Sequence, residues 1–225
     1  MNVRNHLIVG GSHGIGYAIV RNLAKEGHNL YVIARTSGNL TKIDNVTHIK
    51  KDILTKTLDL SILPDEIHGV AYCPGSINLK PFKLIFKRLQ YKCNWAIKTL
   101  KSVLKPLKKA GGSVVLFSTV TVQQGMPFHA SAKGAIEGLT RSLAAEWAPK
   151  IRVNCIAPSL TDTPLASRLL STPEKKEAAS NRHPMKRVGS ADELGSIAAF
   201  LLSQKSSWVT GQIIGVDGGL SSLKI

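Results

Sequence analysis

One stretch near the N-terminus, Gly10-Gly11-Ser12-His13-Gly14-Ile15-Gly16, decides the fold. It follows an apolar run at residues 7–9 and leads into residues 17–24, whose apolar positions recur at helical spacing, so a strand, a turn and a helix are predicted in that order. Glycines in such a turn let a phosphate approach the free backbone N–H groups at the helix start, where the helix dipole also favours negative charge. The stretch therefore predicts a dinucleotide-binding site, with a flexible strand-to-helix loop as the alternative.

The composition suits a single domain without disulfide bonds. The chain has 225 residues, which is enough for one hydrophobic core. Its three cysteines, Cys73, Cys93 and Cys155, are far apart and lack metal-ligand spacing, so we expect reduced thiols, no metal site and a cytoplasmic location. The N-terminus enters a strand directly, and no apolar run approaches the ~20 residues that cross a bilayer, so no targeting or membrane segment is expected.

The formal net charge of +16 raises nucleic acid as a partner. Residues 80–109 carry ten Lys or Arg and no acidic residue. Four of these cations recur at helical spacing: Lys98, Lys101, Lys105 and Lys108. This spacing predicts an amphipathic helix over residues 94–109 with a solvated basic face. No nucleic-acid-binding motif accompanies this basic helix, so nucleic acid is not expected as a partner, and an anionic cofactor or substrate explains the charge as well.

Strands and helices alternate along the whole chain. Further strands are predicted at residues 29–34, 46–51, 68–73, 112–118, 151–157 and 212–216, and helices in a short stretch through residue 89 and at 94–109, 129–147 and 191–202. This alternation predicts an α/β fold, a single-domain Rossmann-type doubly wound parallel sheet over residues 1–225 with helices on both faces. Residues 159–189 are rich in Ser, Thr, Pro and Lys, so we expect them to form a mobile lid over the substrate.

The residue after the second predicted strand indicates the type of cofactor. A carboxylate there binds the ribose 2′-OH of NAD, whereas a cation accommodates the 2′-phosphate of NADP. Arg35 stands there without an acidic neighbour, which favours NADP(H) over NAD(H), although a surface arginine at a strand end is the alternative. After the third strand, Asp52 and Ile53 are candidates to meet the adenine, and Asp52 is equally a candidate helix cap. Pro74 and Gly75 close the fourth strand tightly enough for a flat ring to lie against the backbone.

Together these motifs resemble the short-chain dehydrogenase/reductase family over essentially the whole chain. The matching positions are Gly10, Gly14, Gly16, Cys73-Pro74-Gly75, Ser118, residues 133–139 and 152–158, Thr161, Thr163, and residues 210–212 and 216–219. The resemblance implies hydride transfer between a nicotinamide ring and a small carbonyl or alcohol substrate. It also implies that further residues line the cofactor, namely Ser12, His13, Ile15, Cys73, Lys133, Pro158, Leu160, Thr161 and Thr163.

By the same resemblance, catalysis uses a serine, a tyrosine and a lysine with an asparagine behind them. Ser118, Lys133 and Asn94 stand for the serine, the lysine and the asparagine. Ser118 is then expected to polarise the substrate oxygen and Lys133 to bind the nicotinamide ribose. Four residues before Lys133, where the tyrosine is expected, the chain has His129. His129 is either an altered proton donor or a residue at the helix start with no catalytic role.

Three functions follow from these observations. The first is an NADP(H)-dependent oxidoreductase of small carbonyls and alcohols, and the second is a non-catalytic NADP(H)-binding sensor or scaffold. The third and weakest is a nucleic-acid binder that uses the basic helix. The resemblance also implies self-association as a dimer or tetramer, for which the apolar surface of the helix at residues 132–147 is the expected interface unless that surface is all core.

Overall fold

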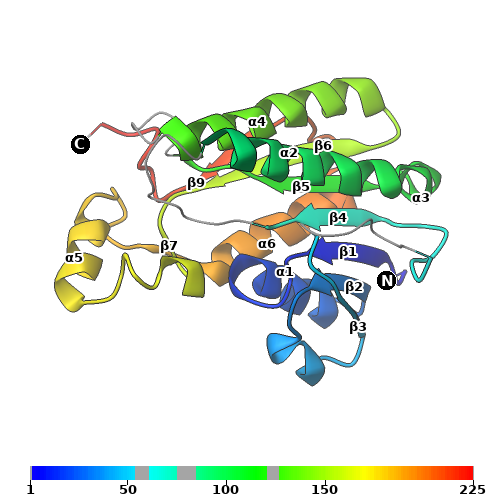
Figure 1. The fold of residues 1–225 in the computed structure, drawn as a ribbon, viewed down its shortest axis with the longest axis horizontal. Coiled ribbons are helices and arrows are strands. Elements are labelled where there is room, and N and C mark those ends of the chain that lie inside the picture. Colours follow the sequence, from blue (N-terminus) through cyan, green and yellow to red (C-terminus); the bar gives the residue numbers. More distant parts are fainter. Residues whose placement is uncertain (1, 54–60, 75–84, 121–126, 225) are drawn as a thin grey trace.

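Parallel strands form one seven-stranded sheet at the centre of the structure, a computed structural model that describes residues 2–53, 61–74, 85–120 and 127–224 (Figure 1). In spatial order the strands are β3 (Val46–Lys50), β2 (Asn29–Ala34), β1 (Asn5–Val9), β4 (Gly69–Tyr72), β5 (Ser113–Phe117), β6 (Arg152–Pro158) and β9 (Ile213–Val216). The chain winds from β1 toward one edge and then from β4 toward the other. Open sheets of this kind bind ligands outside the carboxyl ends of their strands, at the point where the winding reverses.

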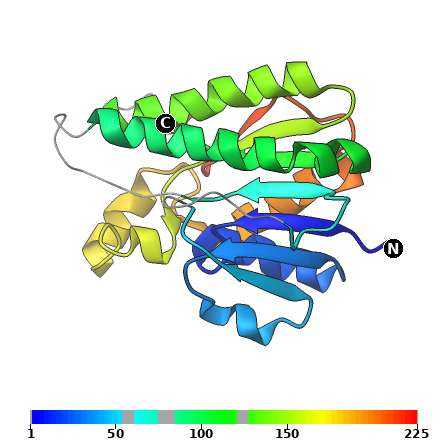
Figure 2. The ribbon, with the colours of Figure 1, turned by 45° about the vertical axis from the view of Figure 1, so that its right-hand side comes forward.

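Helices cover both faces of the sheet (Figures 1 and 2). One face carries α1 (Gly14–Lys25) and α6 (Ala191–Leu202), and the other carries α2 (Ile85–Ser102), α3 (Leu104–Ala110) and α4 (Pro127–Trp147). Alternate residues of each strand face opposite sides, so Leu7 and Val9 join the core under α2 and α4, while Ile8 joins the core under α1 and α6. The predicted doubly wound parallel sheet is confirmed.

α1 and α6 pack against each other so closely that side chains are excluded from part of the contact. A Cβ on Gly195 of α6 would lie 2.9 Å from the carbonyl carbon of Ala18 on α1. At the exposed side of the same contact, Arg21 and Asp192 form an ion pair of 2.6 Å. The N-terminal helix is therefore held in place by a helix near the C-terminus.

The predicted break between two helices near residue 90 is wrong. α2 runs without interruption from Ile85 to Ser102, and the break falls one turn before Pro106, between α2 and α3. Pro106 has no N–H to donate to Ser102, and its ring clashes with that carbonyl in a continuous helix. The helix predicted from residue 94 to 109 is therefore two helices. In the described part of the chain, no helix is long and apolar enough to cross a membrane.

Residues 159–189, predicted to be a mobile lid, contain two short strands and a helix that the sequence analysis missed. Residues 159–189 form β7 (Thr161–Asp162), a 3-10 turn at Pro164–Ala166, α5 (Pro173–Asn181) and β8 (Gly189–Ser190), which pairs with β7. α5 buries none of its residues, so it has no apolar face to reveal it. The sequence does mark the start of α5 with the Thr172-Pro173 pair. The Thr172 hydroxyl accepts from Lys175 N as a helix cap, and Pro173 fits the first helical position. Two further 3-10 turns lie at Gly38–Lys42 and Gln204–Ser206.

Candidate active site

The glycine turn lies where the winding of the sheet reverses. Gly10 and Gly14 have φ angles of +81° and +54°, which side-chain-bearing residues rarely adopt. The Gly10 N–H donates to the carbonyl of Ile33 at 2.8 Å, which ties the turn to β2. On the other side, a Cβ at Gly10 would lie 3.3 Å from Pro74 N, so the turn also lies against the end of β4. Gly75, also predicted in this site, falls outside the described residues.

The start of α1 is open to an anion. His13 is the N-cap residue, its side chain makes no capping hydrogen bond, and the first turn holds no acidic residue. Ser12 Oγ and His13 Nδ1 instead bond to each other at 2.9 Å. Gly14 faces the lid, because a Cβ on it would lie 3.5 Å from Thr163 Cβ. Uncapped N–H groups beside glycines suit a pyrophosphate, so the residues present fit a dinucleotide.

The residues predicted to meet the adenosine part of the cofactor lie in the loops after β2 and β3. Arg35 follows β2 and is exposed, and in the described part of the chain it makes no ion pair. The same loop then passes the glycine turn, since a Cβ on Gly38 would lie 2.7 Å from the carbonyl oxygen of Ser12. Asp52 is half-buried and Ile53 is buried just after β3. Arg35 thus belongs to a loop that reaches the predicted phosphate-binding turn, and no described residue forms an ion pair with it.

Ser118 and Lys133 come together at the carboxyl end of β5. Ser118 follows β5 directly and is 2% exposed. Its hydroxyl donates to Glu137 Oε1 at 2.5 Å and lies 3.4 Å from the carbonyl oxygen of Lys133. The Lys133 ammonium donates to the carbonyl of Phe117 at 2.7 Å. Two of the four predicted catalytic residues are therefore in contact, and Glu137 is a third polar group that the sequence analysis did not single out.

Two side chains of α4, Lys133 and Glu137, point toward this strand end. His129, Lys133 and Glu137 are spaced by four residues, which places them on one face of the helix. His129 lies in the first turn of α4. Asn94 is exposed on α2, and no hydrogen bond among the described residues joins it to Ser118 or Lys133. The structure therefore groups Ser118, Lys133 and Glu137 without Asn94.

Two cysteines near the site have thiols that stay protonated at neutral pH. Burial raises the pKa values of the Cys73 and Cys155 thiols to about 12, and the nearby Lys133 charge offsets only part of that rise. Thiolate is the reactive form of cysteine, so neither side chain is a nucleophile at neutral pH. Among the described residues, no group of three or more His, Cys, Asp or Glu is placed to hold a metal ion.

The end of β6 supplies the predicted nicotinamide-side residues. Pro158 ends the strand, and its carbonyl accepts a bond from the Thr119 hydroxyl at 3.2 Å. Beyond it, Thr161 Oγ1 donates to the carbonyl of Ser159, Thr163 Oγ1 donates to the carbonyl of Thr161, and the Leu160 carbonyl accepts from Gly189 N. Thr119 links the ends of β5 and β6, a role that sequence spacing did not reveal.

His183, regarded as ordinary in the sequence analysis, fastens the lid to β6. It is 3% exposed, and its Nδ1 lies 2.8 Å from the carbonyl oxygen of Ala179 in α5. A carbonyl only accepts, so Nδ1 carries the proton, and in the neutral ring Nε2 accepts from the Ser159 hydroxyl at 2.9 Å. The ring therefore joins the end of α5 to the residue after β6.

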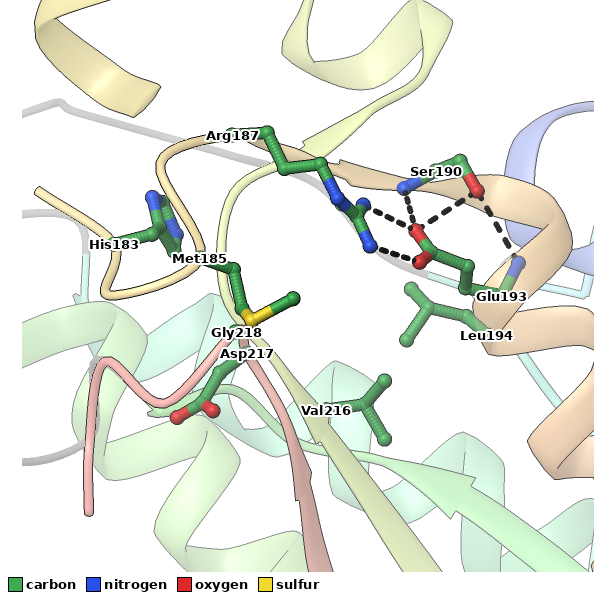
Figure 3. A pocket seen from close by; sticks show the side chains of 10 residues that line it. His183, Met185, Arg187, Ser190, Glu193, Leu194, Val216, Asp217 and Gly218 are labelled. Carbon is green, nitrogen blue, oxygen red and sulfur yellow. Dashed lines mark hydrogen bonds and ion pairs between the residues drawn. The ribbon is translucent and has the colours of Figure 1, made fainter. Parts of the chain in front are cut away.

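A hollow of about 50 Å³ lies beneath the lid, next to His183 and the end of β9 (Figure 3). Arg187 and Glu193 face each other across its rim in a two-pronged ion pair of 2.6 and 2.9 Å. The bonds from Arg187, and then those from Ser190, lower the pKa of Glu193 to about 2. Neither Ser118 nor Lys133 lines this hollow, and small-molecule pockets are several times larger. The hollow is therefore not the expected substrate site.

Comparisons with known sequences agree with this geometry. Residues 84–221 match the family model described as enoyl-(acyl carrier protein) reductase, and residues 4–71 match the model described as short chain dehydrogenase. A tropinone reductase homologue from Arabidopsis thaliana is 35% identical over 243 residues, covering 96% of this chain and 92% of the relative. A tropinone reductase homologue from Datura stramonium is 33% identical over 241 residues, covering 95% and 90%.

Solved structures show the same architecture. A short chain dehydrogenase family protein from Francisella tularensis superposes with a TM-score of 0.85 at 28% identity, covering 99% of this chain and all of that one. A protein from Agrobacterium tumefaciens assigned as a 2-deoxy-D-gluconate 3-dehydrogenase, solved with bound NADP, superposes with a TM-score of 0.88 at 27% identity, covering 98% and 97%.

Proposed function

Because the chain belongs to the short-chain dehydrogenase/reductase family of NAD(P)-dependent oxidoreductases, we propose that it interconverts a small carbonyl compound and its alcohol with NADP(H). One observation carries the proposal. Ser118 and Lys133 meet at the carboxyl end of β5, on the same edge of the sheet as the glycine turn. A hydrogen-bonding hydroxyl and a cation are thus placed where open sheets of this type bind their ligands.

Each polar group has a distinct task in this reaction. The nicotinamide, when bound, supplies or accepts a hydride. The first turn of α1 binds the pyrophosphate through its free N–H groups. With the cofactor bound, Lys133 would donate to the hydroxyls of the nicotinamide ribose in place of the Phe117 carbonyl. Its positive charge would also stabilise the negative charge that develops on the substrate oxygen. Ser118 contacts that oxygen.

The preference for NADP(H) rests on Arg35. The residues from Gly27 to Ile43 include no carboxylate that would bind a ribose 2′-OH, and Arg35 is exposed without an ion-pair partner among the described residues. A guanidinium binds a phosphate through charge-assisted hydrogen bonds. The bound NADP in the similar Agrobacterium structure supports this choice.

We assign the proton donor to His129, which stands where the family has tyrosine. It precedes Lys133 by one helical turn, so the Lys133 charge opposes protonation of the imidazole. An imidazolium gives up a proton more readily than a neutral ring, so carbonyl reduction should be slow at neutral pH and faster as the pH falls.

A pH–rate profile tests this proposal. NADPH oxidation is followed with a panel of carbonyl compounds for the native protein, His129→Ala and His129→Tyr, together with NADPH affinity by fluorescence. We expect His129→Ala to lose the rise at acidic pH at unchanged affinity, and His129→Tyr to be faster at neutral pH. A native protein that binds NADPH and reduces no carbonyl would instead be the non-catalytic sensor or scaffold, an alternative that the replacement of tyrosine by His129 favours.

Self-association through α4 stays a prediction. Four of the apolar residues of α4 are buried in the core, namely Ala132, Ile136, Ala144 and Trp147, whereas Leu139 and Leu143 are half-buried and Ala135 is exposed. α2, which packs beside α4, exposes Ile97 to 43%. We propose that a dimer or tetramer forms through α4 together with α2, and light scattering over a dilution series tests the self-association. Cys73 and Cys155, which are free thiols in the described structure, support a cytoplasmic location. The exposed Lys98, Lys101, Lys105 and Lys108 form the predicted basic face, for which we propose no nucleic-acid partner.

A further inference from the structure

One hydrogen bond joins the first residue of the lid to its C-terminal part. Ser159 directly follows β6, and His183 stands 24 residues further along the chain, just beyond α5. His183 Nε2 lies 2.9 Å from Ser159 Oγ. His183 is 3% exposed and Ser159 is half-buried, so bulk water competes weakly for this bond. The bond persists in either protonation state of the ring, because a hydroxyl both donates and accepts.

His183 is itself fixed on the side of the strand β9. Two residues beyond it, the Met185 N–H donates to the carbonyl of Gly218, which follows β9, at 3.2 Å. A Cβ on Gly218 would lie only 3.7 Å from the Cβ of His183 (Figure 3). The other ring nitrogen, Nδ1, donates to the carbonyl of Ala179 at 2.8 Å. The imidazole therefore connects the residues after β9, and the end of α5, to the residue after β6.

Ser159 also continues into the end of β6, beside the proposed reaction centre. Its neighbour Pro158 ends the strand, and the Pro158 carbonyl accepts from the Thr119 hydroxyl at 3.2 Å. Thr119 follows Ser118, the residue proposed to contact the substrate. The Ser159 carbonyl accepts from Thr161 Oγ1 at 3.1 Å. A displacement of Ser159 would therefore reach the residues expected to meet the nicotinamide.

We propose that His183 is a positioning residue that fixes the end of β6 through Ser159 and thereby orients the nicotinamide of the bound cofactor. This inference rests on the function proposed above. The pyrophosphate and the 2′-phosphate are expected at the glycine turn and at Arg35, which the bonds described here do not involve. Loss of the bond between His183 and Ser159 should therefore leave most of the affinity for NADPH in place. Hydride transfer is more sensitive, because a misplacement of about 1 Å can slow a reaction by about 100-fold.

Two amide substitutions separate the roles of the two ring nitrogens. An asparagine amide is separated from Cβ by as many bonds as Nδ1 is, and a glutamine amide by as many as Nε2 is. His183→Asn should therefore keep the bond to Ala179 and lose the bond to Ser159, whereas His183→Gln should do the reverse. Each variant loses one bond of the lid, so both should lose unfolding free energy to a similar extent. Only the loss of the bond to Ser159 should slow hydride transfer.

The rate of hydride transfer is measured in single turnovers of the NADPH complex with a reducible carbonyl compound. The Kd for NADPH and the fluorescence anisotropy of the bound nicotinamide are measured without substrate. We expect His183→Asn and Ser159→Ala to slow hydride transfer by at least about tenfold and to lower the anisotropy, with the Kd within about twofold of the native value. His183→Gln should stay within about threefold of the native rate. Ser167→Ala changes an exposed serine of the lid and should match the native protein in each measurement.

The two losses should not add, because both variants remove the same bond. The double variant with His183→Asn and Ser159→Ala should be no more than about twofold slower than either single variant. The inference is overturned if His183→Asn keeps the native rate and anisotropy, or if His183→Gln loses as much of both as His183→Asn. If the native protein binds NADPH and reduces no carbonyl, the proposed function fails, and the anisotropy of the variants still decides the inference.

Discussion

Gly16 stands so close to Gly10 that a Cβ on Gly16 would lie 2.2 Å from the Gly10 carbonyl oxygen. The carbonyl oxygen belongs to the backbone of the turn between β1 and α1, and a Cβ is fixed to its own backbone, so no side-chain rotation can relieve the contact. The first turn of α1 can therefore approach β1 only because residue 16 has no side chain. This contact fixes where the free N–H groups of α1 point.

We expect Gly16→Ala to abolish detectable NADPH binding and to cost about 1–3 kcal/mol of unfolding free energy, because the turn must open. Gly138→Ala is the matched control on α4, where a Cβ would meet nothing within 4 Å. That change should stabilise the protein by about 0.4–1 kcal/mol by restricting the unfolded chain. NADPH fluorescence and denaturant unfolding measure both effects. Native-like binding by Gly16→Ala would contradict the role of this turn.

Arg35→Ala should remove the preference for NADPH over NADH. Charge-assisted hydrogen bonds to a phosphate are worth about 1.5–3 kcal/mol, so we expect the native protein to bind NADPH at least about tenfold more tightly. Lys150 is an exposed cation at the amino end of β6, whereas Arg35 follows the carboxyl end of β2. Lys150→Ala should therefore leave the preference unchanged. Fluorescence titration with each cofactor decides the matter, and equal affinities in the native protein would refute the assignment.

The protein should lose stability in acid because of His6. This ring is 1% exposed, neither of its nitrogens has a hydrogen-bond partner in the described structure, and its centroid lies 5.1 Å from that of His28. Burial, followed by the charges of His28, His68 and Arg4, lowers the pKa of His6 to about 3. The unfolded chain takes up this proton near pH ~6.5, so His6 reduces the unfolding free energy by about 1.4 kcal/mol for each pH unit from there down to about 3.

Denaturant unfolding at several pH values between neutral and acidic measures this slope. His6→Leu removes the titrating group and should flatten it by about one proton. His13→Leu changes an exposed histidine and should not. If the native protein and His6→Leu show parallel pH dependence, another group is responsible.

Ser190→Ala should destabilise the protein through α6. Ser190 Oγ accepts from the Glu193 N–H while Glu193 accepts from Ser190 N, which is a complete capping box. Losing the cap should cost about 1 kcal/mol. Ser196→Ala, on the exposed side of α6, should be neutral or slightly stabilising, because alanine is the better helix former. Chemical unfolding measures the unfolding free energy of both variants. A Ser190→Ala protein as stable as the native protein would contradict the role of the cap.

The sequence predicted the sheet well because the central strands β1, β4 and β5 are apolar runs between turn residues and are buried on both faces. It placed the break between the two helices near residue 90 instead of just before Pro106. It also missed α5, because α5 buries no residue and only its N-terminal cap is visible in the sequence. Ser118 and Lys133 were found through their motifs. Glu137, 19 residues beyond Ser118, was missed because its hydrogen bond to Ser118 depends on how α4 packs against the end of β5, which spacing does not encode.

The contact between Ala18 and Gly195 can form only late in the synthesis of the chain. α1 leaves the ribosome early, but its partner α6 begins 166 residues after α1 ends, a delay of about 8–33 s at typical translation rates. During that interval the side of α1 that packs on α6 lacks its partner, and its apolar side chains stay exposed on the nascent chain. A premature stop codon between Lys25 and Ala191 would therefore yield a chain that carries the whole glycine turn and α1 but lacks the helix that holds α1 in place.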